Sequence, residues 1–325
     1  MDIAWRHLTL SDLKDWAGLL ETIEQTDIRG ENFDVEDLRA QLDDTVINVA
    51  SDTLAGFTDQ GMAAYGIIRS RRTRQGFRAV LDGGVLPGLR RSGTGGRIVE
   101  WARTWAEEQC AELPPGASLE LQSRVSDRNP GHAVLMLSQG FSPVRWFHDL
   151  ECTFPDGLTG TPVPEGNIVT AYTEQLGEAA RRAWNDVFGT AAGGMECTPE
   201  SWQRLTHAPA FRPELSFVMC SRISGEVIGV LLADYYPADT AMTGVREVWI
   251  QSAGARRSAR GTGVMAGLLS HACHAYHEKG YQRAALSVHT DEPRAESGVH
   301  EQAGFRRTHT WAVYTRTFSG SDPES

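Results

Sequence analysis

Residues 256–265 read Arg-Arg-Ser-Ala-Arg-Gly-Thr-Gly-Val-Met and connect a predicted strand to a predicted helix. The strand is expected at 245–250, where β-branched and aromatic residues are concentrated. The helix is expected from Val264 onward, because apolar residues recur at helical spacing as far as Lys279, and Gly280 ends it. A glycine-rich turn that opens a helix directs unpaired backbone N–H groups at an anion above the helix N-terminus. With three arginines around two glycines, this stretch is typical of a pyrophosphate cradle.

Two familiar phosphate-binding motifs fit this stretch poorly. A Walker loop needs Gly-Lys followed by Ser or Thr, which is absent here. A dinucleotide fingerprint would need an early strand and a ribose-binding acid about twenty residues further on. The segments that follow are instead a strand at 284–289, a turn at 290–295 that reads Thr-Asp-Glu-Pro-Arg-Ala, and Val-His-Glu-Gln-Ala-Gly-Phe at 299–305.

In this order, residues 247–305 resemble the GNAT superfamily of acyl-CoA N-acyltransferases. The family pattern is a strand, R/Q-x-x-G-x-G/A, a helix, a strand, an N-P type turn and L-Y-E-x-x-G-F. The resemblance implies an α/β (mixed α+β) fold, in which a mixed, mostly antiparallel sheet is flanked by helices. It also implies acetyl-CoA as cosubstrate and no metal. The residues that it places at the acetyl-CoA site are Ala253, Ala255, Arg256, Arg260, Gly261, Thr262, Gly263 and Val264.

Two positions depart from the family pattern. The first Arg/Gln position is interpreted as Ser258, with Arg260 directly before the first glycine. The family's Tyr, which usually protonates the departing CoA thiolate, is His300.

The same order of elements occurs once before. Residues 85–96 contain Arg90-Arg91-Ser92-Gly93-Thr94-Gly95 ahead of a helical run, a strand follows at 118–123, and Gly-Phe returns at 140–141. The two copies are displaced by 168 residues at the glycines and by 164 at Gly-Phe. The first copy has the fuller glycine motif, so Arg90, Gly93 and Gly95 are candidates for binding a second CoA.

The repeat predicts two tandem GNAT-like domains, at 1–155 and 166–318. A linker rich in Pro and Gly is expected at 156–165, and residues 319–325 are expected to be disordered. Each domain is expected to open with a strand and helices and to continue with a hairpin, at 53–69 in the first and at 215–235 in the second.

Composition narrows the choice of partners. The 325 residues carry a net charge of −11, which argues against nucleic acid and is compatible with a cationic amine substrate. The sequence contains no run of about 18 apolar residues, so no membrane span is predicted, and the N-terminal residues do not have the pattern of a signal peptide. The five cysteines are scattered without a C-x-x-C pair, so we expect reduced thiols and a cytoplasmic location. Three histidines at 271, 274 and 277 spread around a helix rather than converging on a metal.

Acyl transfer from a thioester to an amine needs a group that takes a proton from nitrogen, and a group that donates one to sulfur helps. For the base we predict Glu247, at the head of the strand that leads into the cradle, because relatives of the mycothiol synthase type carry a similar Glu-containing run there. For the acid we predict His300. A surface glutamate without a role and a surface histidine without a role remain the alternatives.

The second copy is expected to be the catalytic one. Met136 occupies the Tyr position of the first copy and cannot donate a proton, whereas His300 can. The predicted function is transfer of an acyl group, most simply acetyl, from CoA to a primary amine of a small molecule by direct attack. The alternatives are a mycothiol synthase-like acetyltransferase and a non-catalytic CoA-binding sensor or scaffold, in either case as a monomer or a homodimer.

Overall fold

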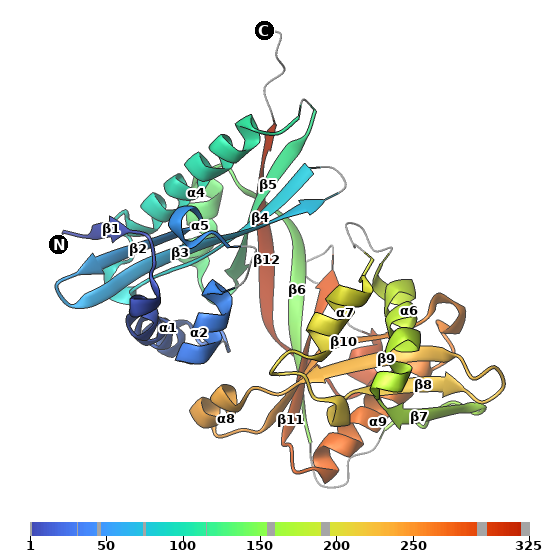
Figure 1. The fold of residues 1–325 in the computed structure, drawn as a ribbon. Coiled ribbons are helices and arrows are strands. Elements are labelled where there is room, and N and C mark those ends of the chain that lie inside the picture. The colour runs from blue at the N-terminus through green and yellow to red at the C-terminus, as the bar shows by residue number, and fades with distance from the viewer. Residues whose placement is uncertain are drawn as a thin grey trace. The chain divides into compact units, whose positions relative to one another are not determined.

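The computed structural model describes residues 2–30, 32–43, 47–73, 76–114, 116–154, 160–189, 196–290 and 298–319. These residues form two compact units (Figure 1). Unit 1 contains the described residues of 1–146 together with 309–319, and unit 2 contains those of 147–290 and 298–308. The predicted turn at 290–295 lies outside the described residues except for Thr290, and so does the tail beyond Ser319.

Unit 1 is a sheet with the strand order β1-β2-β3-β4-β5-β12 and helices packed against it. Its elements are β1 (Ala4–Arg6), α1 (Leu13–Asp27), α2 (Val35–Leu42), α3 (Val49–Asp52), β2 (Thr53–Thr58), β3 (Gly61–Thr73), β4 (Gly76–Val85), α4 (Thr94–Ala111), β5 (Ser118–Ser126), α5 (Pro130–Ser138) and most of β12 (Arg306–Ser319). Neighbouring strands run antiparallel, apart from the parallel pair β4 and β5. Two apolar clusters fill the unit, one of them formed largely by α4 against β3, β4 and β5.

Unit 2 repeats this plan with the strand order β6-β11-β10-β9-β8-β7. Its elements are β6 (Ser142–Thr153), β7 (Asn167–Ala171), α6 (Gly177–Phe188), α7 (Pro199–Thr206), β8 (Phe217–Ser221), β9 (Val227–Asp234), α8 (Pro237–Thr243), β10 (Glu247–Ala255), α9 (Val264–Glu278), β11 (Arg283–Thr290) and α10 (Gly298–Gln302). The parallel pair is now β10 and β11. The predicted fold class and both predicted hairpins are confirmed.

The domain division differs from the expected one at the last strand of each copy. Strand β12 closes the second copy in sequence, yet its residues from 309 onward belong to unit 1, where Trp311–Ser319 pair antiparallel with β5. Strand β6 closes the first copy in sequence, yet from Phe147 onward it belongs to unit 2. Each copy therefore contributes its last strand to the other unit. The predicted boundaries 1–155 and 166–318 follow the sequence repeat and so assign each last strand to its own copy, whereas the structure assigns it to the other unit.

The repeated Gly-Phe pair has a structural explanation. In both copies a short helix is followed by a glycine with positive φ, Gly140 or Gly304. The N–H of the next residue, the phenylalanine, donates a hydrogen bond to the carbonyl of Met136 or His300. This is a Schellman C-cap, in which only glycine adopts the left-handed conformation without strain. The phenylalanine is buried in each case. The motif therefore ends a helix and anchors the next strand.

Candidate functional site

The cradle predicted from residues 256–265 is an open turn between β10 and α9. Gly261 and Gly263 both have positive φ, at 75° and 82°, and Gly263 is the N-cap of α9 without a side-chain cap. The first helical hydrogen bond runs from Gly267 N–H to the Gly263 carbonyl, so the first-turn amides point outward. A Cβ at Gly261 would meet nothing within 4 Å, and at Gly263 only Pro164 at 3.5 Å. This space and these donors fit a pyrophosphate.

Arginines border the cradle on one side. Arg256 faces Asp186 of α6, with Nε 3.7 Å from Oδ2, and the same oxygen accepts the Arg257 N–H at 2.8 Å. The Arg260 side chain is exposed, and among the described residues it makes no ion pair or hydrogen bond. Arg260 is therefore the guanidinium that remains available to an anion.

The parallel strands β10 and β11 separate toward the cradle. They pair from Glu247 opposite Arg283 to Ile250 opposite Leu286, and among the described residues no pair follows. A bulge between Ile250 and Ser252 redirects β10, which continues to Ala255 paired with β9. Among the described residues nothing pairs with the other edge of 251–255, which includes Ala253 and Ala255, so this edge can accept an extended ligand that carries amides.

Glu247 lies at the start of β10, at the opposite end from the cradle. Its side chain is 19% exposed, and its Oε2 forms an ion pair with Nε of Arg283. Burial raises the pKa of the Glu247 carboxyl to about 7; the positive charge of Arg283 opposes this rise, and the charge of Glu151 adds to it. A carboxyl with a pKa near neutrality can take up and release protons at physiological pH.

Asp234 is a second carboxylate on this face of the sheet, and it was not among the predicted residues. It is 4% exposed at the end of β9, directly opposite Trp249, which is two residues from Glu247 and therefore on the same face. Oδ2 accepts a hydrogen bond from the Tyr236 hydroxyl at 3.4 Å, and Oδ1 has no partner among the described residues. Burial raises the pKa of Asp234 to about 6. The available signal was an acid that ends an otherwise apolar strand.

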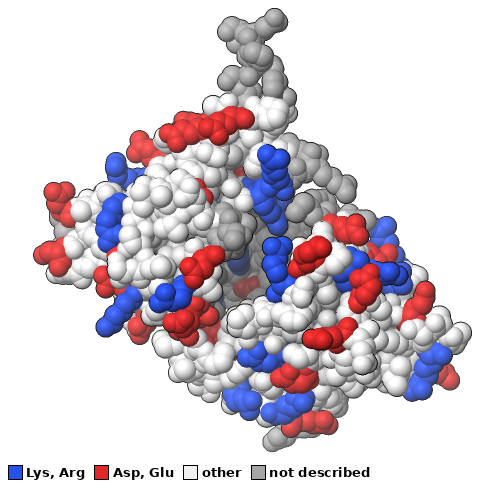
Figure 2. Space-filling model, viewed as in Figure 1, with Lys and Arg blue, Asp and Glu red and all other residues white. Residues whose placement is uncertain are grey.

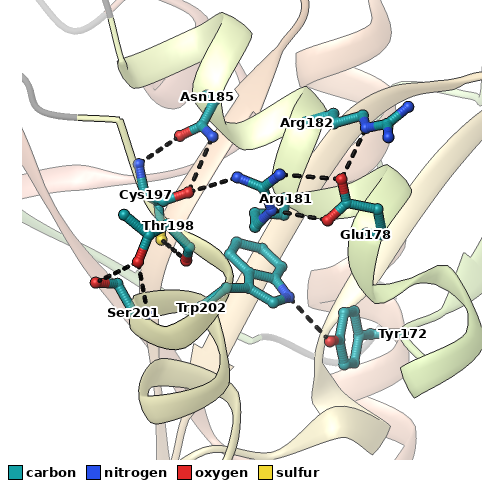
Figure 3. A network of polar contacts seen from close by, with 9 residues as sticks. All are labelled: Tyr172, Glu178, Arg181, Arg182, Asn185, Cys197, Thr198, Ser201 and Trp202. Atoms are coloured by element: carbon teal, nitrogen blue, oxygen red, sulfur yellow. Dashed lines mark hydrogen bonds and ion pairs between the residues drawn. The ribbon is translucent and has the colours of Figure 1, made fainter.

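Helices α6 and α7 cover the part of this face next to Asp234. Figure 3 shows how α6 is tied to the residues that lead into α7: Arg181 donates to the Cys197 carbonyl at 2.6 Å, and the Asn185 amide both donates to and accepts from the Cys197 backbone. Thr198 caps α7, and the Trp202 indole donates to the Tyr172 hydroxyl at 3.3 Å. The apolar side chains of α6, α7, β8 and β9 fill the space between helices and sheet. The surface that these helices form against the sheet is predominantly apolar.

His300 lies in α10, half-buried, with its carbonyl bonded to the Phe305 N–H. Among the described residues, no hydrogen bond or ion pair joins the side chains of His300 and Glu247. The structure thus places the two predicted catalytic residues on separate elements, and the role of His300 stays a prediction.

The structural correspondence between the two cradles differs from the one expected. The left-handed residues are Arg91 and Gly93 in unit 1 and Gly261 and Gly263 in unit 2, so the offset is 170 rather than 168. The short 3-10 helices at Pro87–Leu89 and Arg257–Ala259 show the same offset. Arg260, not Ser258, is therefore the counterpart of Arg90 and occupies the family's first Arg/Gln position. Met265, not Gly263, is the counterpart of Gly95.

The described residues of unit 1 differ from the second site at two positions. The guanidinium of Arg90 forms a bidentate ion pair with the buried Asp27, at 2.7 and 2.9 Å. The parallel pair begins with Gly76 opposite Ser118, where unit 2 has Glu247 opposite Arg283. Among the described residues of unit 1, the counterpart of Arg260 is therefore already paired with a carboxylate, and the parallel strands begin without a Glu–Arg pair.

A splayed parallel pair of strands that leads into an uncapped, glycine-rich helix start defines the GNAT fold, here present twice. Residues 178–305 match the family described as Acetyltransferase (GNAT) family. The second copy is thus a domain of the GNAT acetyltransferase family. The predicted resemblance to this family and the predicted enzyme class are confirmed. No curated protein sequence matches the chain.

Solved structures support the tandem layout. A GCN5-related N-acetyltransferase from Sphaerobacter thermophilus superposes with a TM-score of 0.81 at 22% identity, over 98% of this chain and 97% of that one. A tandem GNAT protein from the clavulanic acid biosynthesis pathway gives a TM-score of 0.72 at 14% identity, over 99% and 100% of the two chains. A fungal glucosamine N-acetyltransferase region gives 0.70 at 13% identity, over 97% of this chain and 38% of the longer protein. These identities establish the fold alone.

Two further observations concern cofactors and partners. Among the described residues, no group of three or more His, Cys, Asp or Glu side chains is placed to hold a metal ion. His271 and His277 instead pack edge-on against Phe217 and Phe154. No helix in the described part of the chain has the length and apolar character of a membrane span.

Proposed function

We propose that unit 2 transfers the acetyl group of acetyl-CoA to a primary amine of a small molecule, with Glu247 as the general base. The observation that carries this proposal is the half-buried Glu247, whose pKa is raised to about 7, on the same strand that continues into the open cradle. Acidic and basic side chains are interspersed over the described residues on the face seen in Figure 2, and the chain has a net charge of −11. This favours a small cationic acceptor over a polyanion.

The residues of unit 2 divide the work. The first-turn amides of α9 and the Arg260 guanidinium hold the pyrophosphate of the CoA substrate, and the open edge of 251–255 binds its extended amide-bearing arm. Glu247 accepts the proton of the amine nitrogen as that nitrogen bonds to the thioester carbonyl carbon. The carbon–sulfur bond then breaks and the thiolate leaves, taking a proton from His300 or from water. Alignment of two substrates in this arrangement supplies the larger part of the rate.

The proposal is tested by thiol release from acetyl-CoA with a panel of primary amines that includes amino sugars, since one structural relative is a glucosamine N-acetyltransferase. For the wild-type protein we expect kcat/KM to rise with pH through about 7, because the Glu247 carboxyl must be ionised to act as base.

Glu247→Gln should lower kcat by about 10²–10⁴-fold and remove this acidic limb, on the usual magnitude for general base catalysis. The affinity for CoA should stay unchanged, because Glu247 lies at the other end of β10 from the cradle. Glu226→Gln, in the exposed hairpin between β8 and β9, is the matched control. A full loss of CoA binding in Glu247→Gln would contradict the assignment, and CoA binding without turnover of any amine would favour a sensor.

A further inference from the structure

Glu151, which the proposed chemistry does not use, contacts the partner of the proposed base. Its Oε2 lies 2.9 Å from Nη1 of Arg283. Nε of the same guanidinium forms the ion pair with Glu247. The Arg283 guanidinium therefore forms ion pairs with two carboxylates, each through a different nitrogen. The three side chains are 19–31% exposed, so water reaches them only in part.

The three side chains come from three adjacent strands of unit 2. Arg283 begins β11 and is the direct parallel neighbour of Glu247 in β10. Glu151 lies in β6, on the other side of β11. In sequence, β6 is the strand that follows the first Gly-Phe pair, so Glu151 is contributed by the first sequence copy. The site of the second copy is thus completed by a strand from the first.

The charges around Glu247 oppose one another. Arg283 favours the ionised carboxylate, while the negative charges of Glu151 and of Asp239 in α8 favour the protonated form. Asp234 adds a further carboxyl on the same face. Arg246, the preceding residue, lies over the Tyr281 ring at 4.5 Å and also contacts the carbonyls of 279 and 280. Arg283 is therefore the cation that balances Glu247, and Glu151 competes for it.

We propose that Glu151 is a positioning residue for acyl transfer: by holding one side of the Arg283 guanidinium, it limits the pairing of Arg283 with Glu247 and keeps Glu247 able to accept a proton. This inference rests on the proposed function, in which Glu247 is the base. If the Arg283 guanidinium paired with Glu247 alone, it would favour the ionised carboxylate more strongly. The pKa of Glu247 would then be lower, and Glu247 would be a weaker base at neutral pH.

The test is the pH profile of kcat/KM in the full-length protein. The acceptor is a primary amine of low basicity, such as a hydrazide, so that the acidic limb reports the enzyme and not the amine. Glu151→Gln should move the acidic limb down by about one pH unit, the size expected when a nearby negative charge, which disfavours ionisation of Glu247, is lost. Arg283→Met should move the limb up by a similar amount. Arg283→Lys retains the charge and should leave the limb close to its wild-type position.

Unit 1 offers a matched control. There Arg78 and Glu120 lie opposite each other on the parallel strands β4 and β5, with Nε 3.2 Å from Oε2. Glu120→Gln removes a glutamate from a comparable ion pair and should leave the profile unchanged. The folding of every variant is checked by circular dichroism and its cradle by CoA affinity.

The possible outcomes separate this inference from the proposed function. Opposite shifts in Glu151→Gln and Arg283→Met support the positioning role. A uniform loss of activity in Glu151→Gln at every pH, with an unmoved acidic limb, overturns it and leaves Glu247 as base. An unmoved limb in Arg283→Met, measured on a soluble and folded protein, overturns it as well. If the wild-type protein acetylates no amine, it is the proposed function that fails.

Discussion

Two carboxylic acids in unit 2, Glu247 and Asp234, have pKa values raised by burial. Because their surroundings differ, the first can exchange protons with a ligand, whereas the second affects the stability of the fold. Glu247 has Arg283 beside it and a fifth of its side chain exposed, so it can exchange protons with a ligand. Asp234 is almost fully buried, and among the described residues only the Tyr236 hydroxyl donates a hydrogen bond to its carboxylate. A buried carboxylate with so few donors destabilises the folded state whenever it is ionised.

The effect of Asp234 on stability should therefore depend on pH. The pKa of its carboxyl is raised from 3.8 to about 6 in the folded protein, so between these values the folded state binds more protons than the unfolded state. Wild-type stability should fall, relative to Asp234→Asn, as pH rises from about 4 to about 6, by at most about 3 kcal/mol. Urea unfolding at pH 4, 5, 6 and 8 measures the difference. A difference that stays constant across this range would show that Asp234 does not titrate there.

The residue scale is also where prediction from sequence was least complete. A family pattern pointed to the head of one strand and so to Glu247 as the candidate base, a role that stays a proposal. Arg283, Glu151 and Asp234 could not be predicted, because they reach the site through strand pairing, and neither the register nor the order of strands is written in the local sequence. His300 remains a prediction that rests on its position in the motif.

At the scale of elements, the strand–turn–helix unit of the cradle could be predicted well, but its alignment between copies could not. The sequence contains Gly-x-Gly at 93–95 and at 261–263, and an alignment by residue identity pairs these two motifs. The backbone instead places left-handed residues at 91 and 93 in unit 1, where Arg91 adopts φ 61°. Because a non-glycine residue rarely takes this conformation, the letters alone could not reveal the shift of two residues.

The corrected alignment changes which substitutions form a matched pair. Gly263→Glu would place a side chain and a negative charge at the helix start where the pyrophosphate is proposed to bind, and CoA affinity should fall by at least about 100-fold. Its counterpart is Gly93→Glu, at the N-cap of α4, which has the same left-handed backbone and carries a similar strain. Since Arg90 is already paired with Asp27, we expect Gly93→Glu to leave CoA binding and turnover intact.

Calorimetric titration with CoA is the measurement, and one binding site per chain is expected. Two sites in the wild-type protein, of which Gly93→Glu removes one, would show that unit 1 also binds CoA. Loss of turnover in Gly93→Glu but not in Gly263→Glu would show that the catalytic unit is misassigned.

At the scale of the whole molecule, the tandem repeat could be read from the sequence, but the exchange of the last strands could not. A strand with alternating apolar residues has the same local pattern whichever sheet it joins. The choice is made by the partner edges: β12 pairs with β5 over nine residues, and β6 is the neighbour of β11. The segment before β7 is likewise more than a spacer, because Pro162 and Pro164 lie against Gly267 of α9.

The exchange predicts where core substitutions in the last strands will act. Tyr314, late in the sequence, is buried in the cluster formed by α4, β4 and β5 of unit 1. Leu150, in the first half of the sequence, is buried in the cluster formed by α9, β10 and β11 of unit 2. Truncating either side chain to alanine should cost about 2–5 kcal/mol, as is usual for large buried side chains.

Hydrogen exchange followed by mass spectrometry should show the two losses in opposite units. In Tyr314→Ala, amide protection should fall in β4 and β5, which precede the substitution by about 190 to 240 residues. In Leu150→Ala, it should fall in β10, α9 and β11, which follow the substitution by about 100 to 140 residues. Because the substituted strands belong to sheets formed mainly by the other copy, the local sequence neighbours of each substitution should be less affected than these distant strands. If Tyr314→Ala loosened β10 and β11 while β4 and β5 kept their protection, each copy would retain its own last strand, and Glu151 would no longer be placed beside Arg283.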